Sequence, residues 1–436
     1  MVEASPVMNR TRSIVSVAVE LFAIGLLLSS KLAAEDKSAG GKHSYQEQFL
    51  HALHEGPLIN SAPYQYVFGS IFVPKADAEE ARLESLSVKK ALAYLEQGAE
   101  AWSNTSKCVA CHTNGSYMAY RPALTSTLGR PSQKVWDFFV ATLRQQRTTP
   151  KPELLRELGP TQVIYVAAGL AQWDAHVSKA LSAETRQALD LMFAIQEPSG
   201  AWKPPGNCWP PFEADSYQAA TMAAMAVAAA PGWATSLGQG KTLEGVELLK
   251  SYLRRESPPH DYGGVFLLWA ASSMPDLLSA DKKRQLVETI RKHQRPDGGW
   301  SIRTFATPEA WGSGNRAAKL RAEPEFRDPP SDGHQTGLAI TVLRAAGIPA
   351  QEPRIQRGIK WLLSNQRISG RWWTRSLNTD EWHFITYSGT CYALLALSSC
   401  NVLTPQPVSA MPGSRSVKQP ISAVQPSPPQ HPADLH

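Results

Sequence analysis

Two cysteines and one histidine give the strongest chemical signal in the chain. Cys108 and Cys111 are separated by two residues and are followed directly by His112. Cys-x-x-Cys-His is the attachment motif of a c-type haem, in which both thiols bond to the porphyrin and the imidazole binds the iron. The spacing lets one tight turn present both sulfurs to one ring edge. We therefore expect one covalent haem c, held by Cys108, Cys111 and His112. A zinc site built from the same three residues is the main alternative.

The residues after this motif are further candidates for haem contact. Arg121 is predicted to pair with a haem propionate, since a guanidinium suits a carboxylate, and Tyr117 and Tyr120 would lie nearby. Ordinary loop packing is the alternative for each. The sixth iron ligand stays open, because Met118 is too close to His112 in sequence to reach the opposite haem face easily. The histidines that remain as candidates are His260, His334 and His383.

The N-terminus has the pattern of an export signal. Two arginines precede an apolar run over residues 14–30, and small residues follow up to Ala34. Glu20 interrupts the run and Leu32 is larger than a cleavage site favours, so an uncleaved anchor competes, although the run is short for a bilayer span. We expect the protein to be exported, either periplasmic or anchored to the outer side of the cytoplasmic membrane. Bacteria attach haem covalently on that side, so the signal and the motif support each other.

Composition is that of a globular protein with a large core. The chain has 436 residues, 43% of them hydrophobic and 19% charged, which is enough for one large domain or two smaller ones. The net charge of +6 is not gathered in one block, so we expect no nucleic-acid partner. Three cysteines remain outside the motif, an odd set that does not suggest a disulfide framework.

The pattern along the chain divides it into four parts. Residues 1–34 are the export signal or anchor, and residues 35–84 are an N-terminal extension. A helical repeat array occupies residues 85–402, with the haem-attachment loop at 103–125. Proline, serine and glutamine dominate residues 403–436, which predicts a disordered tail.

The array contains a motif that occurs three times, Gln-x-x-x-Gly-x-Trp. Each copy follows a polar helix-period segment and precedes a smoother apolar one, so the unit is an outer helix, a turn and an inner helix. Such hairpins bury their inner helices only if the array closes or stacks. The three copies are Gln196 to Trp202, Gln294 to Trp300 and Gln366 to Trp372. Further helices are expected at 78–100, 135–146, 161–173, 243–254 and 264–274.

These repeats resemble those of squalene–hopene and oxidosqualene cyclases, whose fold is shared with protein prenyltransferase β subunits. The resemblance implies an all-α fold, an α/α toroid of two concentric rings of helices around a central apolar cavity. It also implies that the motif's Gln and Trp hold neighbouring helices together. An isoprenoid or triterpenoid is the ligand it suggests.

The chemistry of those families is not matched by the residues here. Hopene cyclases use an Asp-x-Asp-Asp acid that this chain lacks, and Asp215 has the pattern of a helix N-cap. Prenyltransferases hold zinc with Asp, Cys and His, but Gly389 stands where that His would be, and His334 replaces the Cys after Asp332. The catalytic residues therefore stay unknown.

The haem iron is then the best-supported reactive centre. We expect an exported monohaem c-type protein on a cyclase-like toroid, with a redox or electron-transfer role, a redox partner protein and a link to an apolar ligand. The alternatives are a haem-bearing scaffold without a substrate cavity and a non-redox terpenoid-cyclase-like enzyme. Aromatic residues that line a cavity or pack in the core are Trp209, Phe212, Tyr217, Trp269, Trp311, Trp373, Trp382 and Tyr387.

Overall fold

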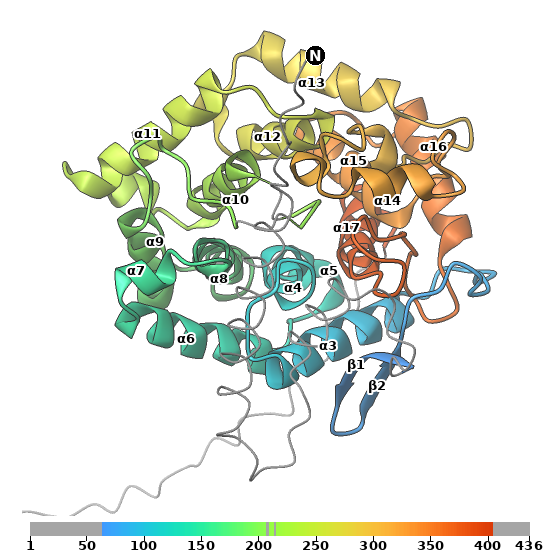
Figure 1. The fold of residues 1–436 in the computed structure, drawn as a ribbon, viewed down its shortest axis with the longest axis horizontal. Coiled ribbons are helices and arrows are strands. Elements are labelled where there is room, and N and C mark those ends of the chain that lie inside the picture. Colours follow the sequence, from blue (N-terminus) through green and yellow to red (C-terminus); the bar gives the residue numbers. More distant parts are fainter. Residues whose placement is uncertain (1–62, 206–208, 213–214, 404–436) are drawn as a thin grey trace, which may run out of the picture.

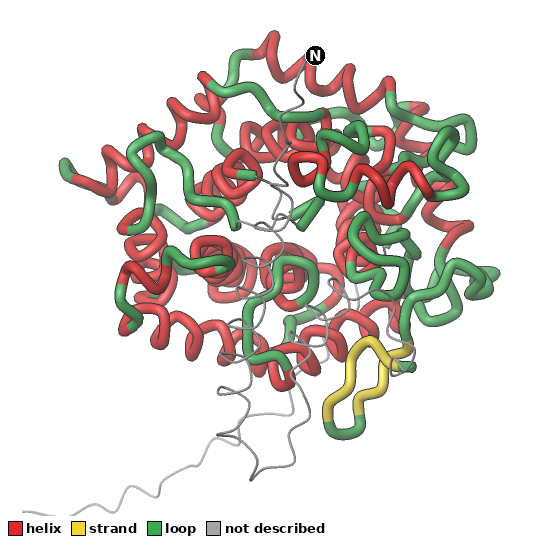
Figure 2. Tube along the Cα trace, viewed as in Figure 1, coloured by secondary structure: helices red, strands yellow, loops and turns green. Residues whose placement is uncertain are grey.

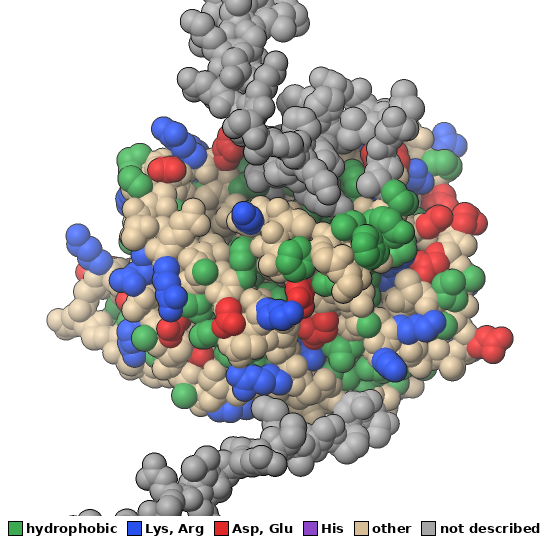
Figure 3. Space-filling model, turned by 90° about the horizontal axis from the view of Figure 1, so that it is seen from below, with side chains coloured by type: hydrophobic (Ala, Val, Ile, Leu, Met, Phe, Trp, Pro, Cys, Tyr) green, Lys and Arg blue, Asp and Glu red, His purple; other side chains and the backbone are tan. Residues whose placement is uncertain are grey.

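The computed structural model describes residues 63–205, 209–212 and 215–403. The predicted signal or anchor, most of the N-terminal extension and nearly all of the C-terminal tail lie outside the described residues. Within the described ranges, no helix combines the length and the apolar character needed to cross a bilayer. Lysine and arginine side chains are interspersed with acidic ones on the face shown in Figure 3.

Two rings of helices make up the body of the molecule (Figures 1 and 2). The outer helices are α3 (Val88–Thr105), α6 (Gln133–Thr148), α9 (Ala183–Ala194), α11 (Lys241–Arg255), α13 (Ala280–Lys292) and α16 (Pro353–Asn365). The inner helices are α4 (Asn114–Tyr120), α8 (Gly159–Trp173), α10 (Ser216–Ala229), α12 (Asp261–Ser273), α15 (Gly333–Ala345) and α17 (Ile385–Ser399). Each inner helix contacts the next and α17 contacts α4, so the inner ring closes. The predicted all-α toroid is confirmed.

Several smaller elements lie before the toroid or in the connections between its helices. An antiparallel hairpin, β1 (Tyr64–Phe68) and β2 (Ile71–Pro74), precedes the toroid and packs on α3. The short helices α5 (Thr125–Leu128), α7 (Lys151–Leu154) and α14 (Ala317–Ala322) lie in the connections.

Hydrophobic patterning explains which helices lie inside. Outer helix α16 buries Ile355, Ile359 and Leu362 on one face and leaves charged residues on the other, as expected for an amphipathic helix. Inner helix α17 is buried around almost its whole surface. Small residues let inner helices approach closely: a Cβ at Gly337 of α15 would lie 2.5 Å from the backbone nitrogen of Ala393 on α17.

The repeated tryptophan ties each outer helix to the turn that follows it. In all three copies the indole Nε1 donates to a carbonyl in the last turns of the preceding outer helix at 2.8 Å; the pairs are Trp202 with Met192, Trp300 with Ile290 and Trp372 with Leu362. The motif glycines have φ between 94° and 96°, a conformation that only glycine adopts without strain.

The repeated glutamine links one hairpin to the next outer helix. Its amide nitrogen donates both to the motif glycine's carbonyl and to a carbonyl at the start of the following outer helix; the second acceptors are Gly245 for Gln196, Arg354 for Gln294 and Ser87 for Gln366. The structural role implied by the resemblance is therefore present.

Two sequence-based boundaries are wrong. The first outer helix is expected over 78–100 but runs from Val88 to Thr105. Residues 78–87 are irregular instead, because the bridge between Arg82 and Arg367 holds them against the last repeat. The segment 103–125, expected as a loop, is mostly helical: α3 extends to Thr105 and α4 begins at Asn114. Only about one turn around the Cys-x-x-Cys-His motif is irregular.

Candidate functional site

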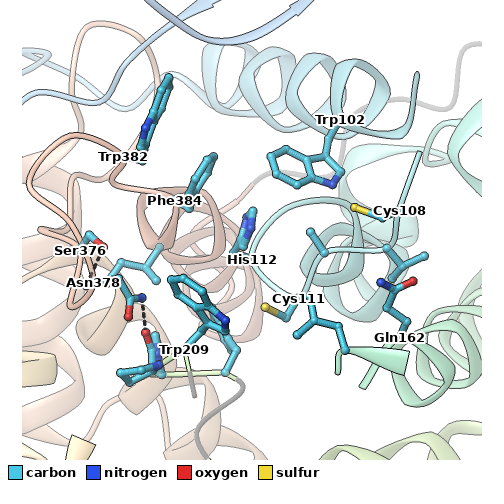
Figure 4. Close-up of a pocket in the computed structure, with 17 residues that line it drawn as sticks. Trp102, Cys108, Cys111, His112, Gln162, Trp209, Ser376, Asn378, Trp382 and Phe384 are labelled. Atoms are coloured by element: carbon cyan, nitrogen blue, oxygen red, sulfur yellow. Dashed lines mark hydrogen bonds between the residues drawn. The ribbon is translucent and has the colours of Figure 1, made fainter. Parts of the chain in front are cut away.

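An apolar pocket lies at one end of the toroid, where the inner helices begin (Figure 4). The space between its lining atoms is about 840 Å³, part of it open to solvent. Four parts of the chain line it: residues 102–112 before α4, the start of α8, residues 209–212 before α10, and residues 376–385 around the start of α17. Cys108, Cys111 and His112 all belong to this lining.

The residues directly after the motif fix the shape of its turn. Asn114 accepts from the backbone nitrogen of Ala110 at 2.8 Å and donates to the carbonyl of Cys108 at 3.0 Å. A Cβ at Gly115 would lie 2.6 Å from the carbonyl oxygen of Ala110, so this position requires glycine. Ser116 donates to the carbonyl of Cys111 at 2.6 Å. The first turn of α4 thus holds the motif turn in one conformation.

The imidazole of His112 is fixed on three sides. Its Nδ1 lies 2.7 Å from the hydroxyl of Thr113, which in turn lies 3.1 Å from the hydroxyl of Tyr66. Phe384 stacks on the ring at 4.3 Å, and Trp102 contacts it edge-on at 4.8 Å. Burial lowers the pKa of His112 to about 3, so the ring is neutral at physiological pH, the state in which it binds a metal.

The three motif residues do not form a ready-made site for a zinc ion in the part of the chain that the structure describes. Across the ranges given above, no three Cys, His, Asp or Glu side chains converge in the way that a metal ion bound by protein ligands requires. A c-type haem needs only one protein nitrogen for its iron, because the thiols bond to porphyrin carbons. A metal binds in the plane of the imidazole, so Phe384 on the ring's face does not occupy the line of Nε2.

Neutral polar groups from two segments meet at the pocket, and the cation of Arg316 lies beside two of the lining residues. The amide of Asn378 donates to the carbonyl of Pro210 at 2.7 Å, which joins the segments before α17 and α10. The guanidinium of Arg316 donates to Asn378 at 3.0 Å and lies 5.0 Å from the centre of the Trp209 ring. No charged side chain is among the described residues that line the pocket.

The structure does not bring Arg121 to this pocket. Its buried guanidinium lies 3.2 Å from Glu96 and donates to the carbonyl of Gly129 at 3.0 Å. Tyr117 also donates to Glu96, whose pKa is raised chiefly by burial. Arg121 lies away from the pocket because α4 carries the chain away from the motif turn. Closeness in sequence was the only signal for the predicted propionate contact.

None of the four candidates for the sixth ligand is among the described lining residues. Met118 is fully buried on α4 and packs toward Gly169 of α8. His334 uses both nitrogens, with Tyr262 at 2.9 Å and Ser388 at 3.0 Å. The other two accept backbone N–H groups at 3.0 Å, His260 from Gly263 as the cap of α12 and His383 from Ser376.

Aromatic side chains meet across the middle of the inner ring. Tyr120 of α4 stacks on Trp269 of α12 at 5.4 Å, and both contact Tyr392 of α17, at 4.9 and 6.0 Å. His334 of α15 adjoins Tyr392 at 5.0 Å. These rings pack against one another inside the inner ring of helices, and the apolar pocket described above lies at one end of the toroid. Of the aromatic candidates, Trp209, Phe212 and Trp382 line the pocket, while Tyr217, Trp311 and Tyr387 are buried in the core.

One family model and several solved structures are similar to parts of this chain. Residues 260–401 match the family model of the squalene-hopene cyclase C-terminal domain. Among solved structures, the type II terpene cyclase MstE from Scytonema is 14% identical with a TM-score of 0.39, over 66% of this chain and 89% of that one. A polysaccharide lyase is 9% identical with a TM-score of 0.44, over 72% and 96% of the two chains. A glycosidase is 12% identical with a TM-score of 0.35, over 72% and 86%.

The matched family model does not extend to the Cys-x-x-Cys-His turn, which lies about 150 residues before it in the sequence. The chain therefore combines a terpenoid-cyclase-like α/α toroid with a motif turn at the pocket end of its first hairpin.

Proposed function

We propose that this chain is an exported monohaem c-type protein, in which a terpenoid-cyclase-like toroid holds one covalent haem for electron transfer or redox chemistry. One observation carries the proposal: both cysteines and the histidine of the motif line the same apolar pocket. The N-terminal export pattern supports it independently, because covalent haem attachment takes place outside the bacterial cytoplasm.

Several residues of the chain would hold the haem, each in a different way. Cys108 and Cys111 would bond to it, and His112 would bind its iron through Nε2 while Thr113 holds Nδ1. Arg316, beside two lining residues, would meet carboxylates there in place of Arg121. The apolar lining would exclude water from the iron, which is one of the ways a protein sets the reduction potential. When bound, the haem supplies a one-electron couple between Fe(III) and Fe(II).

A second candidate is binding of an apolar isoprenoid-type ligand in the same pocket. The lining is predominantly apolar and aromatic, with Trp209, Phe212, Trp382 and Phe384, and the family model that matches the chain is that of a triterpene cyclase. Cationic cyclisation is less well supported, because no carboxylate is among the described lining residues to protonate an alkene. Solvent extraction and mass spectrometry of the purified protein would reveal a retained lipid.

The proposal is tested by producing the full chain in a host with periplasmic haem-maturation machinery. The wild type is expected to keep its haem absorption after denaturation, and the double variant Cys108→Ala/Cys111→Ala is expected to lose it. Cys400→Ala is the matched control, since Cys400 is the C-cap of α17 and does not line the pocket. A wild type without covalent haem would contradict the proposal.

The same samples separate the two redox roles. A reduced spectrum that changes on addition of carbon monoxide shows an open sixth position, which favours catalysis. A spectrum that does not change shows a protein ligand on both faces of the iron, which favours electron transfer.

A further inference from the structure

Three side chains form a stacked column that leads away from His112. Phe384 lies against the imidazole at 4.3 Å with an interplanar angle of 25°. Trp382 stacks on Phe384 at 5.9 Å and 10°, and the ammonium of Lys75 lies 4.1 Å from the centre of the Trp382 ring. Figure 4 shows His112, Phe384 and Trp382 in a row. The rings of Phe384 and Trp382 also line the pocket.

The outer end of the column adjoins a second, polar cleft. Lys75 and Glu381 line this cleft and form an ion pair at 2.6 Å. The cleft holds about 1750 Å³ of empty space, part of it open to solvent. Its charged lining residues are mixed in sign: Lys75, Arg82, Arg367 and Arg375 against Asp77, Glu79, Glu325, Asp380 and Glu381. Trp382 is thus a wall between the apolar pocket and the cleft, covered on the cleft side by Lys75.

The column is densely packed. Trp382 and Phe384 are 5% and 6% exposed, and Trp102 contacts Phe384 from the side at 5.5 Å. Electron tunnelling through packed atoms falls off less steeply with distance than tunnelling through gaps. A column of contacting rings therefore couples an iron bound at His112 to the cleft better than any open path of equal length.

We propose that Phe384 and Trp382 provide the tunnelling path between a haem iron held at His112 and a one-electron carrier protein that docks at the polar cleft over Lys75. In this step the carrier would lose one electron and the group held at His112 would gain it, or the reverse, and no bond or proton would move. Electron-transfer partners use small, weakly held interfaces, and a lining of mixed charge would orient a carrier face of complementary mixed charge. The inference rests on the proposed haem function.

The first test measures how much Phe384 and Trp382 contribute to the rate of electron transfer. The reduced, haem-loaded full chain is mixed with hexacyanoferrate(III) or with the cationic tris(phenanthroline)cobalt(III), and oxidation is followed by stopped-flow absorbance. Trp382→Leu and Phe384→Leu are expected to slow oxidation by both reagents several-fold, with Trp382→Phe intermediate. Trp373→Leu is the matched control, because Trp373 lines the same cleft but not the pocket. Midpoint potentials are measured for every variant, so that a change in driving force is separated from a change in coupling.

The second test locates the entry point by charge and does not depend on the aromatic variants folding. Lys75→Glu is expected to slow the anionic reagent by roughly threefold to tenfold and to speed the cationic one. Lys134→Glu makes the same change of net charge on an exposed residue of α6 outside the cleft and is expected to leave both rates within a factor of about two.

Failure of the electron path and failure of the proposed haem function give different results. A wild type without haem contradicts the proposed function. A haem-loaded wild type whose Trp382, Phe384 and Lys75 variants react like the Trp373 and Lys134 controls overturns the inference alone.

Discussion

Gln366 and Ser87 close the toroid by a reciprocal pair of hydrogen bonds. The backbone nitrogen of Ser87 donates to the side-chain oxygen of Gln366 at 2.7 Å, and the side-chain nitrogen of Gln366 donates to the carbonyl of Ser87 at 3.0 Å. Ser87 is the N-cap of the first outer helix, and Gln366 follows the last. The repeat glutamine that elsewhere joins successive hairpins here joins the two ends of the array.

Removing this amide should destabilise the whole ring. Gln366→Ala leaves the fully buried site without its hydrogen bonds, and we expect the free energy of unfolding to fall by about 2 kcal/mol. Urea unfolding followed by circular dichroism measures it. Gln133→Ala, on the exposed face of α6, should change the value by less than about 0.5 kcal/mol. Equal effects of the two substitutions would show that ring closure does not depend on this pair.

The fold could be predicted because its determinants repeat along the sequence. Gln196, Gln294 and Gln366 make equivalent bonds in three hairpins, so three copies of one motif indicated one architecture. The hairpins without the motif gave weaker boundaries, and the first outer helix was placed ten residues too early. Its start is set by contacts with residues near 367, at the far end of the array, which local periodicity does not reveal.

Gly115 provides a direct test of the motif turn. A Cβ there would lie 2.6 Å from the carbonyl oxygen of Ala110, so Gly115→Ala must displace the backbone between the two cysteines. We expect the yield of covalent haem to fall severalfold, measured as haem absorbance per protein after denaturation. Gly238→Ala is the control, since a Cβ there meets nothing within 4 Å. Normal haem attachment in Gly115→Ala would mean that the turn tolerates a different shape.

The site was predictable only in part, for a physical reason. Cys108, Cys111 and His112 were found because their spacing is local. Phe384 and Trp382 come from the opposite end of the array, and they reach His112 only because α17 contacts α4 when the ring closes. Arg121 shows the reverse relationship, because it is near the motif in sequence but pairs with Glu96 away from the pocket.

Buried histidines should make the haem-free protein acid-sensitive. Burial lowers the pKa of His334 to about 3, below the value near 6.5 of an unfolded chain. Between those values the unfolded state binds a proton that the folded state does not, so stability falls as pH falls from about 6.5 to 3, by up to about 1.4 kcal/mol per pH unit for this residue. His334→Gln in the Cys108→Ala/Cys111→Ala background should flatten the pH dependence of the unfolding free energy by about one proton. An unchanged dependence of the unfolding free energy on pH would show that His334 does not cause the acid sensitivity.

The hydrogen bond between Thr113 and His112 should influence the reduction potential of the proposed haem. If Nδ1 donates to the Thr113 hydroxyl, it makes the imidazole a stronger electron donor, which stabilises Fe(III). Thr113→Val keeps the shape of the side chain but removes the acceptor, so the midpoint potential should rise, while Thr113→Ser should restore it. Spectroelectrochemical titration of the haem-loaded protein measures both. Thr142→Val, which removes a hydroxyl bonded to a carbonyl of α6, should leave the potential unchanged, and a Thr113→Val value equal to that control would show that the hydroxyl has no influence on the ligand.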